Sequence, residues 1–358
     1  MLRFVLVLAS LLPLLPAPSI TTEDLFTSAP FPSCHASTLV ELPNGDLMAA
    51  WFAGSAEGKP DVAIWSAQHT ATGWSRPALL VREPDIAAWN PVLFHSSDRR
   101  LWLYYKFGPV VAGWTGARMV STDEGRTWSA PEDLPAGLLG PIRTKPFVGP
   151  HGLIVSGSST ESYHAWATWI ERSTDDGRTV TRIGPYTLPD PAVRALANSP
   201  LNGSNREIGQ TGPGETTGLI QPTVLSLGGR HLRFYVRGSS NIGRICASDS
   251  FDNGKTWTTP HALDIPNPNS GIDLVRLRDG RIVLIYNPTP QGRSPLALAV
   301  SRDGEHFRLF HTLEDEPGQE FSYPAIIQRK SGDLAATYTW HRTRIRYASI
   351  PLASIPRD

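Results

Sequence analysis

The sequence predicts an all-β protein, a six-bladed β-propeller, on three observations. Glycine (31 residues) and proline (32 residues) are both abundant in the 358-residue chain, and both are typical of turns. Tryptophan is frequent too, with 11 residues, and aromatic residues are enriched in strands. A phrase made of an apolar strand, a turn and a second apolar strand returns six times at a spacing of about 52 residues, which suits a four-stranded blade.

The first residues of the chain form a segment of their own. A basic start at Arg3 is followed by an apolar run over residues 4–15 and then by small residues up to Ser19. This layout predicts a secretory signal peptide over residues 1–19, and hence a secreted or periplasmic protein whose propeller occupies residues 20–358. The run is too short to cross a bilayer, and no later segment is long and apolar enough, so we expect no membrane span.

The six predicted hairpins follow one another along the chain. They lie at residues 39–51, 91–105, 145–155, 221–235, 273–286 and 323–338. The gap between the third and fourth is longer and holds an insert rich in Pro, Gly and Asn at about residues 185–218, which we expect to form a loop on one face. Residues 25–28 are expected to add a strand to the last blade, near residues 344–350, and so to close the ring.

A second motif, Ser-x-Asp-x-Gly-x-Thr-Trp, follows several of the hairpins. Full or nearly full copies stand at residues 121–128, 173–180 and 250–257, and a shortened copy stands at residues 301–307. The Asp of such a turn accepts backbone N–H groups, the Gly takes a positive φ, and the Trp packs between sheets. We therefore interpret the motif as structural and its Asp residues as not catalytic.

Charge and cysteine content exclude several classes of protein. The chain has 33 basic and 33 acidic residues, so it lacks the basic surplus of a nucleic-acid binder. It shows no glycine-rich phosphate loop and no His/Cys spacing typical of a metal site, and we expect no cofactor and no metal. Cys34 and Cys246 lie in different repeats. We expect two free, buried thiols, with a single disulfide as the alternative.

With these repeated Asp-box turns, the chain resembles the sialidase superfamily of BNR-repeat β-propellers over about residues 30–354. The resemblance implies a site on the face where the innermost strands start. In sialidases, three arginines bind a carboxylate there, a tyrosine with a glutamate partner is the nucleophile, and an aspartate is the general acid. Arg237 and Arg293 match the second and third arginines, and Tyr323 matches the nucleophile. We expect these three side chains to converge at one end of the axis.

Three positions depart from the sialidase pattern. His35 stands where the first arginine is expected, and Gln221 stands where the activating glutamate is expected. A neutral amide cannot take a proton from Tyr323. No aspartate matches the general acid, and the nearest carboxylate is that of Glu57, in the loop of residues 54–59.

The remaining set suits β-elimination at a 4-linked uronate. This reaction needs cations that neutralise the carboxylate, a base for the C5 proton and an acid for the leaving oxygen. Arg237 and Arg293 are candidates for the first task, and His35 and Tyr323 for the proton transfers.

The chain also resembles propeller-type rhamnose–glucuronate lyases, in residues 89–94 and 140–146. This resemblance places Asn90, Arg143 and Lys145 in a polar, basic floor, although Lys145 is equally well explained as a solvated loop lysine. Glu161 lies close to Trp166 and Trp169, which either stack on sugar rings or pack between blades.

The sequence thus favours a secreted carbohydrate-active enzyme that acts on a terminal acidic sugar of an oligosaccharide or polysaccharide. Elimination at a uronate is the preferred reaction. The alternatives are an exo-sialidase that hydrolyses terminal sialic acid and a non-catalytic carbohydrate-binding propeller. Outward-facing Arg237 and Arg293 would favour the binding protein.

Overall fold

The computed structural model describes residues 19–162, 165–197 and 217–357. The predicted signal peptide therefore lies outside the described residues except for Ser19, and so does much of the predicted insert. The all-β prediction is confirmed, because the described residues form 25 strands, two short 3₁₀ helices (Val111–Gly113 and Leu352–Ser354) and one α-helix, α1 (Asp190–Ala197). No helix in these ranges is long and apolar enough to cross a membrane.

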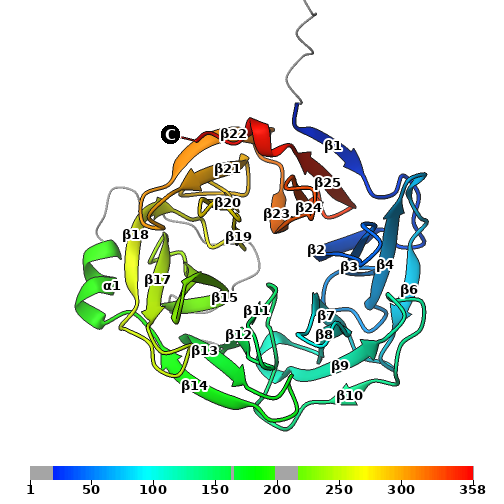
Figure 1. The fold of residues 1–358 in the computed structure, drawn as a ribbon, viewed down its shortest axis with the longest axis horizontal. Coiled ribbons are helices and arrows are strands. Elements are labelled where there is room, and N and C mark those ends of the chain that lie inside the picture. The colour runs from blue at the N-terminus through cyan, green and yellow to red at the C-terminus, as the bar shows by residue number, and fades with distance from the viewer. Residues whose placement is uncertain (1–18, 163–164, 198–216, 358) are drawn as a thin grey trace, which may run out of the picture.

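The strands form five sheets, and the largest of them contains two antiparallel groups joined by a parallel pairing of residues 165–166 with residues 217–218. Six antiparallel units thus follow one another along the chain, and Figure 1 shows them arranged around a common centre. Unit 1 consists of β2 (Ser33–Glu41), β3 (Leu47–Gly54), β4 (Ala63–Thr70), β5 (Gly73–Trp74) and β6 (Ala78–Val81). Unit 2 consists of β7 (Ala88–His95), β8 (Leu101–Phe107), β9 (Thr115–Ser121) and β10 (Glu132–Asp133). Unit 3 consists of β11 (Phe147–Val148), β12 (Ile154–Glu161), β13 (Ala165–Ser173) and β14 (Thr181–Tyr186).

The second half of the chain repeats this arrangement. Unit 4 consists of β15 (Thr217–Gly228), β16 (His231–Gly238), β17 (Arg244–Ser250) and β18 (His261–Pro266). Unit 5 consists of β19 (Asp273–Arg276), β20 (Ile282–Tyr286), β21 (Leu296–Ser301) and β22 (Arg308–Glu314). Unit 6 consists of β23 (Phe321–Gln328), β24 (Leu334–Trp340), β25 (Arg344–Ile350) and the N-terminal strand β1 (Thr21–Asp24). The first strand of each unit lies nearest the centre (Figure 1).

The start of the described chain joins its last unit. Strand β1 pairs with β25 in antiparallel register, from Thr21 opposite Ser349 to Asp24 opposite Arg346. The strand expected at residues 25–28 thus lies a few residues earlier. Units 1 and 6 are also linked directly, because the backbone N–H of Cys34 donates to the carbonyl of Arg342 at 2.8 Å.

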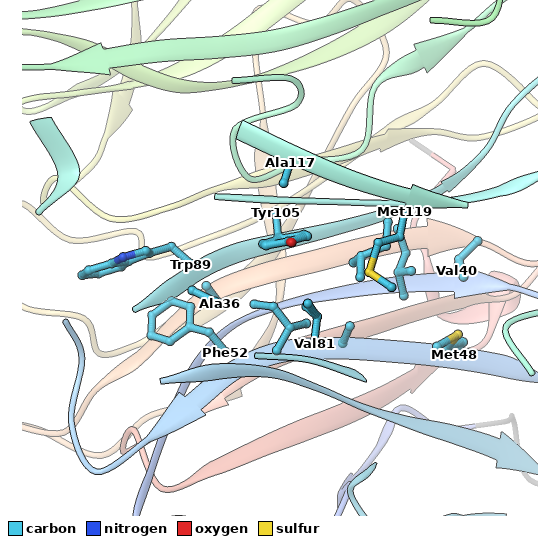
Figure 2. Packing of buried hydrophobic residues seen from close by; sticks show 14 of the residues in the cluster. Ala36, Val40, Met48, Phe52, Val81, Trp89, Tyr105, Ala117 and Met119 are labelled. Atoms are coloured by element: carbon cyan, nitrogen blue, oxygen red, sulfur yellow. The ribbon is translucent and has the colours of Figure 1, made fainter. Parts of the chain in front are cut away.

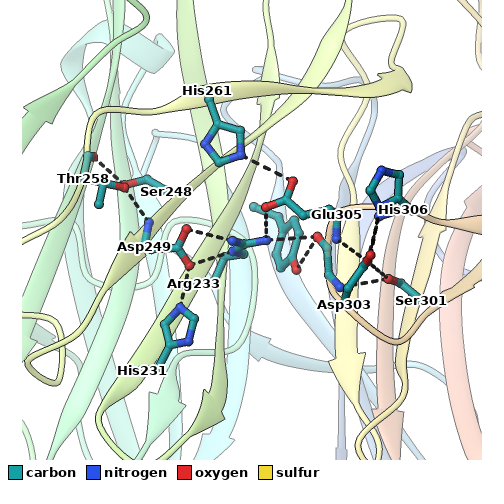
Figure 3. A network of polar contacts seen from close by, with 12 residues as sticks. His231, Arg233, Ser248, Asp249, Thr258, His261, Ser301, Asp303, Glu305 and His306 are labelled. Carbon is teal, nitrogen blue, oxygen red and sulfur yellow. Dashed lines mark hydrogen bonds and ion pairs between the residues drawn. The ribbon is translucent and has the colours of Figure 1, made fainter.

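The apolar core lies between neighbouring units. In one cluster, Met48 and Phe52 of unit 1 pack against Trp89, Tyr105 and other buried side chains of unit 2 (Figure 2). Removing a buried aromatic side chain from such a core costs about 3–5 kcal/mol. The cores therefore fix each inner strand relative to the next.

The Asp-box turns have the structural role that the sequence predicts. In the first copy, Asp123 accepts hydrogen bonds from the backbone N–H and hydroxyl of Thr127 and from the hydroxyl of Ser121. These bonds lower the pKa of Asp123 to about 2. Trp128 donates to the carbonyl of Gly125 and packs against the core between units 1 and 2. The carboxylate of Asp123 is therefore engaged in hydrogen bonds within its own turn.

Both cysteines are free and buried, as expected. Cys34 lies on β2 and Cys246 on β17, in different units. Burial raises the pKa of each thiol, so neither is a reactive thiolate. Among the residues that the structure describes, no group of three or more His, Cys, Asp or Glu side chains could hold a metal ion.

Candidate active site

Four of the inner strands have the same β-bulge near their start. The register shifts by one residue near the start of β2, β7, β15 and β23. At each shift one residue other than glycine has a positive φ: Ala36 (55°), Asn90 (37°), Gln221 (59°) and Tyr323 (51°). Such a conformation is costly for an ordinary residue and persists only where the surrounding structure enforces it. The four bulges therefore set side chains in place at one end of the ring.

Tyr323 is the centre of a cluster of cationic side chains. The guanidinium carbons of Arg143, Arg237 and Arg293 lie 5.5, 5.4 and 5.6 Å from the centroid of its ring. Arg237 is the second-last residue of β16, whereas Arg143 and Arg293 come from the segments before β11 and β21. The expected convergence of Arg237, Arg293 and Tyr323 is confirmed. The inward direction of both arginines removes the observation that would have favoured a binding protein.

The three arginines differ in what they contact. Arg143 is buried and donates to two backbone carbonyls, those of Pro324 and Ile272. Burial lowers its pKa to about 10. Arg237 is 5% exposed and donates one hydrogen bond to the carbonyl of Asn269 at 2.9 Å. Arg143 therefore supports the strand that carries Tyr323. Both Arg143 and Arg237 keep a buried Nε–H with no partner among the described residues.

His35 lies directly against Tyr323. The centroids of the two rings are 4.2 Å apart, and His35 is only 2% exposed. Burial lowers the pKa of His35 well below its usual value, and the positive charges of four arginines, with Arg342 the strongest, act in the same direction. The imidazole is therefore neutral at physiological pH.

Gln221 makes the hydrogen bond to the phenol. Its Nε2 donates to Tyr323 Oη at 3.4 Å, and its backbone N–H donates to Ser159 Oγ at the same distance. The amide oxygen Oε1 is buried without a partner in the described part of the chain. The structure thus places an amide where a sialidase is expected to carry a carboxylate.

Glu320, which was not predicted as a site residue, bridges two of the arginines. Glu320 accepts from Arg293 Nη1 and from Arg342 Nε, each at 2.8 Å, and from Ser322 Oγ at 2.7 Å. Burial opposes ionisation, but Arg293 and Arg342 hold the pKa of Glu320 below its usual value. Arg342 also contacts the carboxylate of Glu57, which brings Glu57 to the rim of the same cluster.

Lys145 and Asn90 contact residues other than Tyr323. Lys145 pairs with the buried carboxylate of Asp273 at 2.7 Å and donates to the carbonyl of Leu274. Asn90 is buried, and its carbonyl accepts from Lys106, which is itself fully buried. Burial lowers the pKa of Lys106 to about 7. Lys145 is therefore engaged with Asp273 and is not a solvated loop lysine. That Asn90 and Lys145 bind substrate stays a prediction.

The segment before β11 runs into the ring instead of forming the start of an inner strand. Its residues contact three other units: Arg143 bonds to carbonyls of units 5 and 6, Thr144 donates to the carbonyl of Pro222, and Lys145 pairs with Asp273. Buried Glu171 accepts the backbone N–H groups of Leu139 and Gly140. The segment therefore forms a fixed floor beneath Tyr323.

Fold and cluster together define a class of protein. An arginine-rich site surrounds one tyrosine, as the resemblance to sialidases implied, and the chain has the sialidase fold. The model of the BNR repeat-like domain matches residues 45–336, and the chain belongs to this family. None of the curated proteins matches the chain.

Solved structures agree on the fold. A protein of unknown function from Dyadobacter fermentans DSM 18053 aligns with a TM-score of 0.73 and 16% identity, over 94% of this chain and all of its own. The intramolecular trans-sialidase from Ruminococcus gnavus gives 0.67 and 14%, over 94% of this chain and 98% of its own. The NanB sialidase from Streptococcus pneumoniae gives 0.66 and 12%, over 93% of this chain and 71% of its own. Identities this low show a shared fold and leave the reaction open.

Proposed function

We propose that the chain is an exported enzyme, a six-bladed β-propeller over residues 20–358, which cleaves a glycan at an acidic sugar by β-elimination at a uronate. One observation carries the choice of reaction. The phenol of Tyr323 has an amide, Gln221, on its oxygen and a neutral imidazole, His35, against its ring. A pair of proton-transfer groups without an activating carboxylate suits an elimination better than nucleophilic attack.

The arginines supply the electrostatic part of this reaction. Arg237 and Arg293 flank Tyr323, and a sugar carboxylate placed between them would accept charge-assisted hydrogen bonds. Neutralising that carboxylate makes the neighbouring C5–H more acidic and stabilises the negative charge that develops when the proton leaves. Arg143, engaged with backbone carbonyls, holds the geometry of the strand.

Tyr323 and His35 supply the proton transfers. One of them takes the C5 proton, the electron pair forms the C4–C5 double bond, and the C4–O bond breaks. The other group then gives a proton to the leaving oxygen, so that no water is consumed. Tyr323 is partly exposed, whereas His35 is buried. We therefore assign the direct contact to Tyr323 and a supporting proton-transfer role to His35.

Hydrolysis of a terminal sialic acid is the second candidate, and one observation favours it. Glu320 joins Arg293 to Arg342, which brings a further guanidinium into the cluster. Arg342 thus stands in for the arginine that His35 replaces, and Glu57 beside it is a candidate acid. Under this reading Tyr323 would attack the sugar, and it would need a base that Gln221 cannot provide.

A substrate panel tests the proposal. The purified protein is incubated with oligosaccharides that contain 4-linked uronates and, separately, with sialosides. The ultraviolet absorbance of an unsaturated uronate and the release of reducing sugar are followed together. We expect an unsaturated product from a uronate substrate. Reducing sugar without an unsaturated product would refute the elimination, and no product of either kind would support a binding protein. N-terminal sequencing of the secreted protein tests export, with a start near residue 20 expected.

A further inference from the structure

A cavity of about 380 Å³ lies among the inner strands of units 3, 4 and 5. Its wall consists of residues 145–148, which include β11, residues 224–226 of β15 and residues 275–278 at the end of β19. Of these eleven residues, seven are apolar, three are basic, one is a serine and none is acidic. The wall thus combines an apolar surface with positive charge.

The cavity lies at the end of the inner strands that is remote from Tyr323. Gly271, before β19, lies beside the ring of Tyr323, because a Cβ atom built on it would be 3.4 Å from that ring. After β19, the backbone N–H of Arg278 donates to Gln328 Oε1 at the end of β23, at 2.9 Å. Strands β19 and β23 therefore run in the same direction, and the cavity wall belongs to their far ends.

The floor beneath Tyr323 separates the cavity from the candidate active site. Arg143 contacts the ring of Tyr323, whereas Lys145, two residues later, lines the cavity. Unit 3 contributes only the two-residue strand β11 to the innermost layer, whereas β15 of unit 4 has twelve residues. The short β11 leaves room beside β15, and the cavity lies there.

The three basic residues of the wall differ in their contacts. Lys145 is paired with the buried carboxylate of Asp273 at 2.7 Å. Arg278 is exposed, and its guanidinium donates to the backbone carbonyls of residues 329 and 330. Arg276 is also exposed, and its guanidinium makes no hydrogen bond or ion pair with any described residue. Arg276 therefore keeps its full set of donors for a ligand, next to a second fixed cation.

The combination of charge and apolar wall defines the ligand. A guanidinium binds a carboxylate through two parallel hydrogen bonds, and the partly exposed side chains of Phe147 and Val148 offer apolar contact beside it. The volume is typical of a site for a small molecule, about 300–1,000 Å³. We infer that this cavity is a second binding site, for a small organic carboxylate with an apolar body. The inference goes beyond the proposed function and requires no glycan.

Phenylacetate is the probe, because it joins one carboxylate to one apolar ring. Its dissociation constant is measured by saturation-transfer NMR. Phenylacetamide has the same shape without the charge, and acetate has the charge without the ring. We expect wild-type protein to bind phenylacetate, and to bind the other two at least about tenfold more weakly.

Variants of Arg276 locate the binding site. Arg276→Gln should weaken the binding of phenylacetate at least about tenfold, and Arg276→Lys should restore part of it. Arg126→Gln is the matched control, because it removes an exposed arginine from the Asp-box turn of unit 2, and it should leave the affinity unchanged. Since the side chain of Arg276 has no partner in the described protein, its variants should melt at the wild-type temperature.

The candidate active site also attracts anions, so Arg237→Gln is titrated in parallel. Loss of phenylacetate binding in Arg237→Gln and not in Arg276→Gln would place the anion at Tyr323 and overturn the inference. Absence of binding to the wild-type protein, or equal affinities for phenylacetate and phenylacetamide, would overturn it too. A wild-type titration with two sites, one of which Arg276→Gln removes, would support it. Because these readouts do not depend on cleavage, failure of this site and failure of the proposed reaction are separate outcomes.

Discussion

Replacing Gln221 with glutamate puts the proposed reaction to its sharpest test, because elimination and hydrolysis predict opposite signs. The substitution keeps the shape of the side chain and places a carboxylate 3.4 Å from Tyr323 Oη. Under hydrolysis the new carboxylate would draw the proton from Tyr323 and activate it as a nucleophile. Under elimination it would hold that proton and repel the carboxylate of the substrate.

The size of the loss under elimination follows from the geometry. A substrate in contact with Tyr323 would bring its own carboxylate to about 5–7 Å from the new charge, and like charges at that separation repel by about 2–3 kcal/mol at an effective dielectric constant of about 20. We therefore expect kcat/KM for a uronate substrate to fall about 30- to 150-fold. The assay is the initial rate of formation of the unsaturated product.

Two matched variants isolate the effect of the charge. Gln221→Met removes the hydrogen bond to Tyr323 without adding a charge, and it should cost less than Gln221→Glu. Gln68→Glu adds the same charge on β4, where Gln68 contacts the carbonyl of Glu124, and it should leave the rate unchanged. A rise in activity of Gln221→Glu, with sugar released by hydrolysis, would refute the elimination mechanism.

The remaining predictions concern the cations and the imidazole. Arg237→Lys and Arg293→Lys should each lower kcat/KM, with a loss of transition-state binding of about 1.5–3 kcal/mol, because an ammonium cannot reproduce the planar fork of a guanidinium. Unchanged rates for both variants would mean that the anion binds elsewhere. His35→Ala should lower kcat by about 10²–10⁴-fold. Because the pKa of His35 is held well below its usual value, the wild-type rate should not fall as the pH passes through about 6.5, and an acid limb there would contradict the assignment. Burial lowers the pKa of Lys106 to about 7, so above pH 7 the unfolded chain binds more protons and the free energy of unfolding should rise by up to about 1.4 kcal/mol per pH unit; urea unfolding between pH 7 and 9 should show that Lys106→Met removes this rise, and equal slopes would refute it.

The repeated elements of the fold were predictable from the sequence because each is a local device. An Asp-box turn such as residues 121–128 needs only its own side chains, and all the bonds predicted for Asp123 are present. The strand that joins unit 6 was expected at residues 25–28 and lies at Thr21–Asp24. Its position depends on pairing with β25, more than 300 residues later, and local composition does not fix such a register.

The candidate site was predictable where one residue stands at the start of an inner strand. Tyr323 could be placed this way, whereas Arg237 and Arg293 were placed by their positions at the second strand of unit 4 and before the third strand of unit 5. Glu320 was missed because its role depends on Arg342 from another hairpin. An acidic residue directly before an apolar strand was the available signal. Arg143 was found, but its hydrogen bonds to carbonyls of two other units could not be inferred from spacing.

The bulge that recurs in four inner strands has the same backbone conformation each time but carries a different side chain. The same bend holds a methyl group at Ala36, amides at Asn90 and Gln221, and a phenol at Tyr323. A single codon change at any of these positions would install a different functional group in an orientation that the scaffold already provides. Ala36, next to His35, is the one of the four bulge positions whose side chain is chemically inert. Directed evolution of a new activity on this scaffold would therefore begin at Ala36.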